Sequence, residues 1–87
     1  IPKFGKRDDV ESDIIGVLHQ MGFHVERLSG PGVPDLLLSR AGRWLVAEIK
    51  GPKGRLTKAQ TVFHHQARAN IPILRSVEQA VEWSRTV

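Results

Sequence analysis

Apolar residues near the start of the chain recur with the period of an α-helix. When residues 10–21 are projected at about 100° per residue, their apolar side chains fall on one arc and most polar ones on the opposite side. Asp8 or Asp9 is suited to cap this helix, and Gly22 to end it. The basic residues 1–7 read as a short lead-in. The pattern predicts an amphipathic first helix.

Short apolar runs separated by turn residues predict three strands in the middle of the chain. Residues 23–29 alternate between polar and apolar positions, whereas residues 35–39 and 44–50 are mostly apolar. The turn sequences GPGVP, at 30–34, and RAGR, at 40–43, separate them. The third strand is apolar on both faces, which is typical of a central, covered strand.

The remainder of the chain predicts two helices around a short strand. Thr57 begins a helix that extends to Ala69, and Thr57 with Gln60 has the spacing of a capping box. Residues 71–76 form a fourth strand, and residues 77–85 a last helix with an apolar stripe. This order of elements predicts an α/β fold with a small mixed sheet flanked by helices.

Length and charge limit the classes of protein to consider. The 87 residues make a single domain, 1–87. With 13 basic and 9 acidic residues the net charge is +4, which favours a polyanionic partner such as nucleic acid, the alternative being a generic basic surface. The absence of Cys excludes disulfides and thiolate metal sites and fits an intracellular protein. No apolar run approaches the ~20 residues of a membrane span.

One acid of the first helix occupies an apolar position. Glu11 projects between Leu18 and Ile15, inside the apolar arc. Because burial of an unpaired carboxylate is costly, Glu11 would need a partner or a metal ion there. The alternative is that Glu11 lies at the rim of the stripe and reaches water.

Two further acids lie at the ends of neighbouring predicted strands. Asp35 follows Pro34 and opens the second strand, while Glu48 and Lys50 lie two residues apart in the third and share a face. Taken singly, Asp35 is a common turn residue, and Glu48 with Lys50 is an ordinary ion pair. Adjacent strands can nevertheless bring Asp35 and Glu48 together, and the first helix can add Glu11.

The three acids together predict a metal site beside phosphate-binding residues. Their oxygen ligands suit a hard divalent cation such as Mg²⁺, which retains several waters. Lys50 can orient or deprotonate a water, or hold a developing oxyanion, which suits metal-assisted phosphodiester hydrolysis. Lys53, Arg55 and Lys58 follow on a Gly-rich loop and a helix start, where both the cations and the helix N-terminus favour phosphate.

These residues resemble a known nuclease motif. PD at 34–35 with EIK at 48–50 resembles the PD-(D/E)XK nuclease superfamily, whose restriction-endonuclease-like αβββαβα core has the same element order. More narrowly, GVPDLLL, AEIKGPKGRLTKAQ and the helix glutamate are similar to the VRR-NUC family (virus-type replication-repair nuclease), compact domains of phage, helicase-linked and repair proteins. The resemblance covers residues 8–83.

The resemblance implies a role for each matching residue. Asp35 and Glu48, helped by the carbonyl of Ile49, would ligate Mg²⁺ or Mn²⁺. Lys50 would activate or position the attacking water. Glu11 would complete the acidic site, directly or through water.

The resemblance also implies a further site residue and a substrate. Gln60 would point toward the site from the second helix, the alternative being that it serves only as the capping-box partner of Thr57. Small standalone members look like Holliday junction resolvases that act as homodimers on branched DNA. The chain is thus expected to be a homodimeric, Mg²⁺-dependent endodeoxyribonuclease inside a bacterial host or phage-infected cell, not secreted.

Other polar and aromatic residues are weaker candidates for a catalytic or binding role. His64 and His65 point about 100° apart on a helix and cannot easily share a metal ion. His19 and His24 are expected at the surface. Trp44 is expected in the core, the alternative being that it stacks on a base.

Two other functional classes make different predictions. A catalytically inactive nucleic-acid-binding module with the same fold would bind DNA without Mg²⁺-dependent cleavage. A purely structural partner domain would keep its function after Glu48→Gln, whereas a nuclease would lose cleavage and keep its fold.

Overall fold

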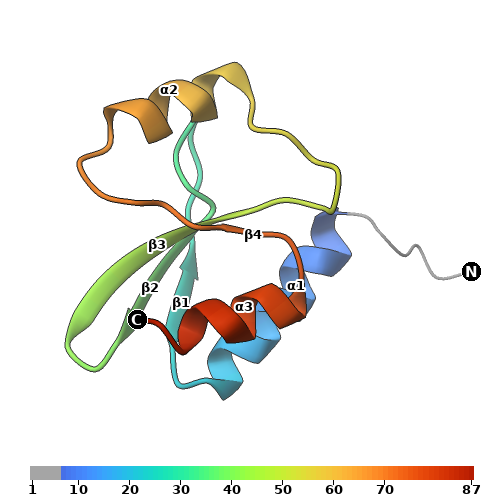
Figure 1. Cartoon of the computed structure of the whole chain (residues 1–87), viewed down its shortest axis with the longest axis vertical. Coiled ribbons are helices and arrows are strands. Elements are labelled where there is room, and N and C mark those ends of the chain that lie inside the picture. Colours follow the sequence, from blue (N-terminus) through green and yellow to red (C-terminus); the bar gives the residue numbers. More distant parts are fainter. Residues whose placement is uncertain (1–6) are drawn as a thin grey trace, which may run out of the picture.

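Seven elements follow one another in the predicted order of helix, three strands, helix, strand and helix (Figure 1). The structure, a computed structural model, describes residues 7–87, and the rest of the predicted lead-in lies outside the described residues. The elements are α1 (Arg7–Gln20), β1 (His24–Arg27), β2 (Leu36–Arg40), β3 (Arg43–Ile49), α2 (Lys58–Gln66), β4 (Ile73–Leu74) and α3 (Val77–Ser84).

The four strands form one mixed sheet in the order β1-β2-β3-β4. The first three are antiparallel neighbours, and β4 runs parallel to β3. A two-residue turn joins β2 to β3, with Ala41 at φ 54° and Gly42 at φ 77°. Positive φ at both positions matches the twist of a tight hairpin. The predicted small mixed sheet is confirmed.

One face of the sheet carries the core. Leu36 and Leu38 of β2 and Ala47 and Ile49 of β3 alternate with outward-facing residues and are fully buried. α1 and α3 lie side by side against this core (Figure 1). The helices contribute the buried residues Ile14, Leu18 and Ala80, with Val10, Ile15, Val17, Met21, Val77 and Trp83 packed around them. The apolar arcs predicted for the first and last helices are therefore confirmed.

The opposite face is only partly covered, and here the predicted position of Trp44 is wrong. The side chain of Trp44 is 67% exposed. β4 pairs only with Glu48 and Ile49, so the first half of β3 has a neighbouring strand on one side alone among the described residues. The apolar run of β3 correctly indicates a strand, but its open edge and uncovered face leave Trp44 outside the core.

α2 lies apart from the other two helices, near the end of β3 (Figure 1). It contains no buried residue. Its first turn meets the glycine-rich loop before β2, where Gly32 has φ +76° and a Cβ would lie 2.6 Å from the carbonyl oxygen of Ala59. Only glycine permits this approach without strain, so the loop fixes the height of α2 above the sheet.

Several boundaries differ from the predicted ones. The first helix begins at Arg7, so Asp8 and Asp9 lie inside it instead of capping it. α2 ends three residues before Ala69, because Ala67 is already extended. β1 and β4 are shorter than predicted, most clearly β4, whose two residues replace a predicted six, whereas β2 and β3 keep their predicted lengths and are shifted by one residue. Within residues 7–87, no helix is long and apolar enough to cross a membrane.

Candidate active site

Asp35 and Glu48 face each other across the β2–β3 ladder. The last regular pair is Leu36 with Ala47, and one further step in the same register places Asp35 opposite Glu48 on the sheet face away from the core. The side chains of the two acids interact directly, since Asp35 forms a hydrogen bond with Glu48. The predicted meeting of the two acids at the strand ends is observed.

Pro34 explains why this pair interrupts the ladder. One step beyond Asp35, the register would place Pro34 opposite Ile49, and proline has no N–H to donate. The N–H of Ile49 instead donates to Oδ2 of Asp35 at 2.8 Å. Pro34 therefore leaves the Ile49 carbonyl without a ladder donor at that position, beside the two carboxylates.

The pKa of Glu48 departs strongly from its ordinary value. Its side chain is fully buried. The pKa of Glu48 is raised to about 7, first because burial penalises the charged form, and then because of the hydrogen bond and the negative charge of Asp35. The nearby His64 opposes this rise. A carboxyl with a strongly raised pKa beside a second acid is a common mark of a functional site.

α2 supplies two partners to the carboxyl group of Glu48. Nε2 of Gln60 donates to Oε2 at 3.1 Å, and Nε2 of His64 lies 3.0 Å from Oε1. Gln60 also accepts from the N–H of Thr57 through Oε1, at 2.8 Å. Gln60 thus has both contacts: one end of its amide closes the capping box, and the other end donates to Glu48.

His64 is the residue that sequence reasoning missed. Its side chain is 16% exposed, and it contacts Glu48 from α2. Its partner in the structure is the carboxyl group of Glu48, and not a metal ion shared with His65. The available signal was its spacing from Gln60, because residues i and i+4 lie one above the other on a helix face. If Gln60 points toward the site, His64 must do so as well.

Lys50 lies two residues beyond Glu48 and is also buried, at 9% exposure. A Cβ on Gly54 would be 3.4 Å from Cβ and Cδ of Lys50, so the loop after β3 packs on the stem of this lysine. Nη1 of Arg75 donates to the carbonyls of Gly51, at 2.9 Å, and Gly54, at 2.6 Å, and holds the loop in place. No short-range pattern in the sequence indicates this role for Arg75.

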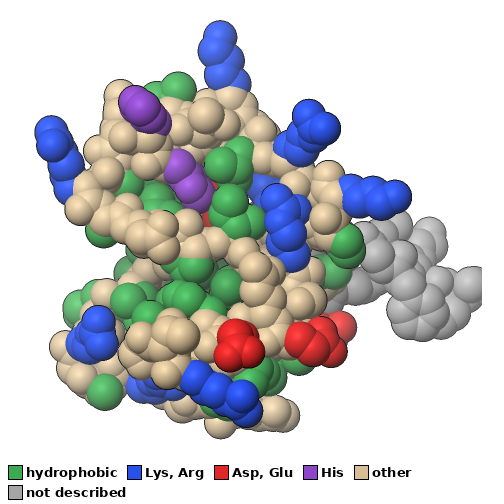
Figure 2. Space-filling view, in the orientation of Figure 1, with side chains coloured by type: hydrophobic (Ala, Val, Ile, Leu, Met, Phe, Trp, Pro, Cys, Tyr) green, Lys and Arg blue, Asp and Glu red, His purple; other side chains and the backbone are tan. Residues whose placement is uncertain are grey.

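The three predicted phosphate-binding cations lie near this end of the sheet and are exposed. Lys53 and Arg55 project from the loop, and Lys58 opens α2. Figure 2 shows Lys and Arg side chains gathered around α2 and the loop before it, with acidic groups lower on the same face. The exposed charge around Asp35 and Glu48 is therefore positive on this side.

Glu11 has a different neighbourhood from the one expected. Oε2 of Glu11 lies 3.5 Å from Nε of Arg27, and the Glu11 side chain is 13% exposed. Among residues 10–87, whose side chains the structure describes, no three His, Asp or Glu side chains come together as a group that could hold a metal ion. A role of Glu11 at the metal site, directly or through water, stays a prediction.

The paired acids fit a hard divalent cation. Two facing carboxylates repel each other when both are ionised, and a cation between them would remove that cost. Mg²⁺ commonly binds through one or two carboxylates and keeps its remaining waters, so a third acid is not required. Asp35, Glu48 and the Ile49 carbonyl supply oxygen ligands of the right type.

Comparisons with known proteins identify the fold. No family model matches the sequence, and no curated protein matches it. Among solved structures, one described as a "VRR_NUC domain" is similar with a TM-score of 0.77 and 23% sequence identity, over 91% of this chain and 94% of that one. The chain therefore has the restriction-endonuclease-like α/β fold of a VRR_NUC domain, as the sequence motifs predicted.

Proposed function

We propose that this chain is a metal-dependent DNA endonuclease that hydrolyses phosphodiester bonds. The observation that carries the proposal is the pair formed by the half-buried Asp35 and the fully buried Glu48, with Lys50 on the same face. A binding module gains nothing from placing two acids where phosphate must approach, because each repels the polyanion. The likeness of the fold to a VRR_NUC domain supports the same conclusion.

Asp35, Glu48 and the Ile49 carbonyl would hold Mg²⁺ or Mn²⁺. When bound, such an ion supplies Lewis acidity toward the phosphate and lowers the pKa of a coordinated water. Asp35 is oriented for this role by the hydrogen bond from the Ile49 N–H at 2.8 Å. Gln60 and His64 fix the plane of the Glu48 carboxyl from above.

Lys50 would position the attacking water and balance the charge that develops on the phosphate. Its buried stem directs the ammonium group from the same face as Glu48, and the loop held by Arg75 restricts its motion. A short-range point charge in a low-dielectric site interacts strongly with a developing oxyanion. Glu11 would act through water at the margin of this site.

Lys53, Arg55 and Lys58 would bind the DNA backbone. All three are exposed and lie on the loop and helix start next to the acids, and the chain carries a net charge of +4. Removal of two such contacts should lower the slope of log affinity against log salt by about one unit per phosphate.

We infer branched DNA as the substrate and a homodimer as the active form, in an intracellular setting. Support comes from the sequence resemblance to small standalone VRR-NUC domains, which resemble Holliday junction resolvases. A twofold dimer would also present two equivalent sites to two strands of a junction.

A cleavage assay on a panel of DNAs tests the proposal. Four-way junctions, flaps, forks, nicked duplexes and linear duplexes are incubated with Mg²⁺, with Mn²⁺ and with chelator, while solution mass is measured in parallel. Metal-dependent cutting with preference for a branched substrate is expected. Binding to DNA without cutting under any condition would favour the inactive binding module of the same fold.

A further inference from the structure

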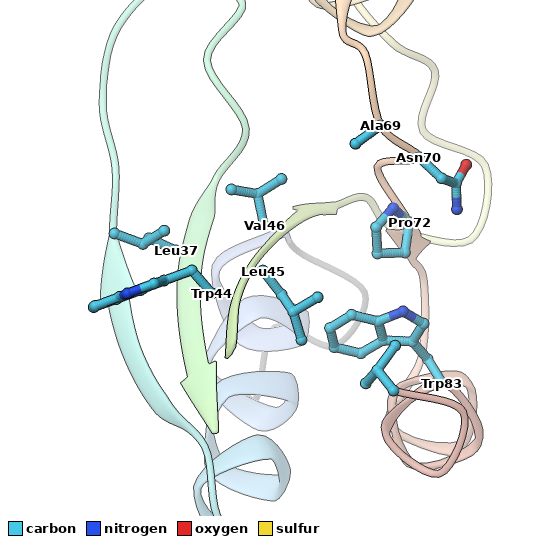
Figure 3. A pocket seen from close by; sticks show the side chains of 9 residues that line it. Leu37, Trp44, Leu45, Val46, Ala69, Asn70, Pro72 and Trp83 are labelled. Atoms are coloured by element: carbon cyan, nitrogen blue, oxygen red, sulfur yellow. The ribbon is translucent and has the colours of Figure 1, made fainter. Parts of the chain in front are cut away.

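A cavity of about 320 Å³ lies along β3 from the acidic pair. Figure 3 shows it between the edge of β3, the segment that follows α2, and α3. Its walls include Trp44, Leu45, Val46, Asn70, Pro72 and Trp83. The volume is at the lower end of the range of about 300–1,000 Å³ for small-molecule sites. The cavity is thus large enough for one small, compact group.

The edge of β3 supplies main-chain hydrogen-bonding groups to this cavity. The N–H groups of Glu48 and Lys50 donate toward β4, to the carbonyls of Pro72 at 2.9 Å and Leu74 at 3.2 Å. Because alternate residues of a strand direct their main-chain groups to the same side, those of Trp44 and Val46 also point this way. β2 pairs with these two residues on the other edge of β3, and on this edge no strand within residues 7–87 pairs with them.

The side chains that line the cavity are apolar or aromatic, apart from one amide. No side chain that lines it is charged, and Asn70 contributes an amide. The ring of Trp83 is fixed by stacking on Phe23, with centroids 5.7 Å apart and 13° between the planes. Trp44 is 67% exposed, so its ring is available at the mouth. A ligand that suits these walls is neutral and flat, with apolar faces and a polar edge.

A nucleobase has this chemistry, and charges outside the cavity suit the rest of a nucleotide. Arg43 and Arg68 are exposed and precede wall residues on either side, so phosphates can lie outside while the base lies inside. Val46 is two residues from Glu48, about 6.6 Å along the strand. A base in the cavity would therefore belong to a nucleotide close to the phosphate at the acidic pair.

We propose that this cavity binds one unpaired base of the DNA on which the acidic site acts. The proposal rests on the proposed function for the identity of the polymer, and it adds how an unpaired nucleotide is recognised. The two tryptophans would contact the base faces, and the main chain of Trp44 and Val46 with the Asn70 amide would meet its polar edge. Duplex DNA has no base free to enter, which favours branched or single-stranded regions.

Intrinsic fluorescence tests the proposal directly. The chain has two tryptophans and no tyrosine, and both tryptophans line the cavity. A short single-stranded oligodeoxynucleotide is titrated into the wild-type protein in chelator, which prevents cleavage. An abasic oligonucleotide of equal length is the control, because it keeps the phosphates and lacks the bases. Quenching by the first and none by the second is expected, and equal responses would overturn the proposal.

Two variants locate the contact by anisotropy of labelled oligonucleotides. Trp44→Ala removes an exposed ring and should weaken binding of the base-bearing strand about tenfold, with unchanged affinity for the abasic strand. Val62→Ala removes an exposed apolar side chain of α2 outside the cavity and should change the affinity for neither oligonucleotide. Equal loss for both strands, or equal loss in both variants, would contradict a base site.

Three other outcomes assign the cavity or the function differently. A change of emission with protein concentration alone, together with a rise in mass and no response to DNA, would give the cavity to a second copy of the chain and overturn the proposal. Base-dependent quenching by a protein that cuts no DNA would support the base site while removing the proposed nuclease. Cleavage of branched DNA without quenching would remove the base site alone.

Discussion

Nε2 of His64 lies 3.0 Å from Oε1 of Glu48, and this contact joins α2 to the acidic end of β3. α2 buries none of its residues, so its position depends on a few specific contacts and not on a packed core. The bonds of Gln60 and His64 to Glu48 and the close approach of Gly32 to Ala59 are three of them. A helix attached in this way makes the site sensitive to changes in α2.

His64→Ala should lower activity and metal affinity by about ten- to hundredfold, as expected for the loss of a group that orients a metal ligand. Without His64 the Glu48 carboxyl group is held less firmly in place. Calorimetric titration with Mn²⁺ should therefore show weaker metal binding even without DNA. His64→Gln, which can still donate to Oε1, should restore part of it. His65→Ala is the matched control, because His65 is its exposed neighbour in sequence. An equal effect in both alanine variants would exclude a specific role for His64.

Substitutions can separate the two roles of Gln60. Gln60→Glu keeps an oxygen that accepts from Thr57 and so preserves the capping box, but it replaces the donor to Glu48 by a negative charge. Cleavage should fall at least tenfold, while helicity by circular dichroism is retained. Thr57→Ala removes the cap, should cost about 1 kcal/mol of stability, and should leave cleavage intact at temperatures where the protein stays folded. The reverse pattern would mean that Gln60 serves only as a cap.

Gly32→Ala tests the contact that sets the height of α2. The new Cβ would lie 2.6 Å from the Ala59 carbonyl oxygen, so the helix must shift, and Gln60 and His64 with it. Gly42→Ala is the matched control, because Gly42 has φ +77° but open space around it. Thermal unfolding should show about 1–2 kcal/mol lost in the control from backbone strain alone. Gly32→Ala should lose more, and it alone should lose cleavage.

The raised pKa of Glu48 predicts how stability depends on pH. Without metal, folded Glu48 has a pKa of about 7 against an ordinary value of 4.5. Between these values the folded protein keeps a proton that the unfolded chain has lost, so the free energy of unfolding falls as pH rises. The contribution is complete below pH 4.5 and absent above about 7, and the total is on the order of 3 kcal/mol. Chemical denaturation at several pH values should show this slope.

The same proton competes with the metal ion. Because ligation needs the ionised carboxylate, Mn²⁺ affinity should rise with pH up to about 7 and then level off. Glu48→Gln should remove the stability slope of the metal-free protein across this window. A Mn²⁺ affinity that is flat across the window would contradict a protonated Glu48 in the metal-free protein.

Much of this site was predictable from local patterns in the sequence. The two-residue spacing of Glu48 and Lys50 placed both on one face of β3, the ends of neighbouring strands brought Asp35 to Glu48, and the capping spacing placed Gln60 at the start of α2. The contacts of Arg75 were not predictable in the same way, because they join residues that are distant along the chain, and His64 could be placed only through its spacing from Gln60. Trp44 was misplaced because strand patterns do not show how far a neighbouring strand extends, and β4 stops before it reaches Trp44.

The most direct measurement is Mg²⁺-dependent cleavage of a four-way junction by wild type and Glu48→Gln at about pH 8, where the wild-type carboxyl is ionised. Glutamine matches glutamate in size and keeps an acceptor for Gln60, so the variant should fold with an equal or higher melting temperature in the absence of metal. The account predicts metal-dependent cutting by the wild type and none by the folded variant. Equal cutting by both proteins, or none by the wild type on any DNA, would contradict it.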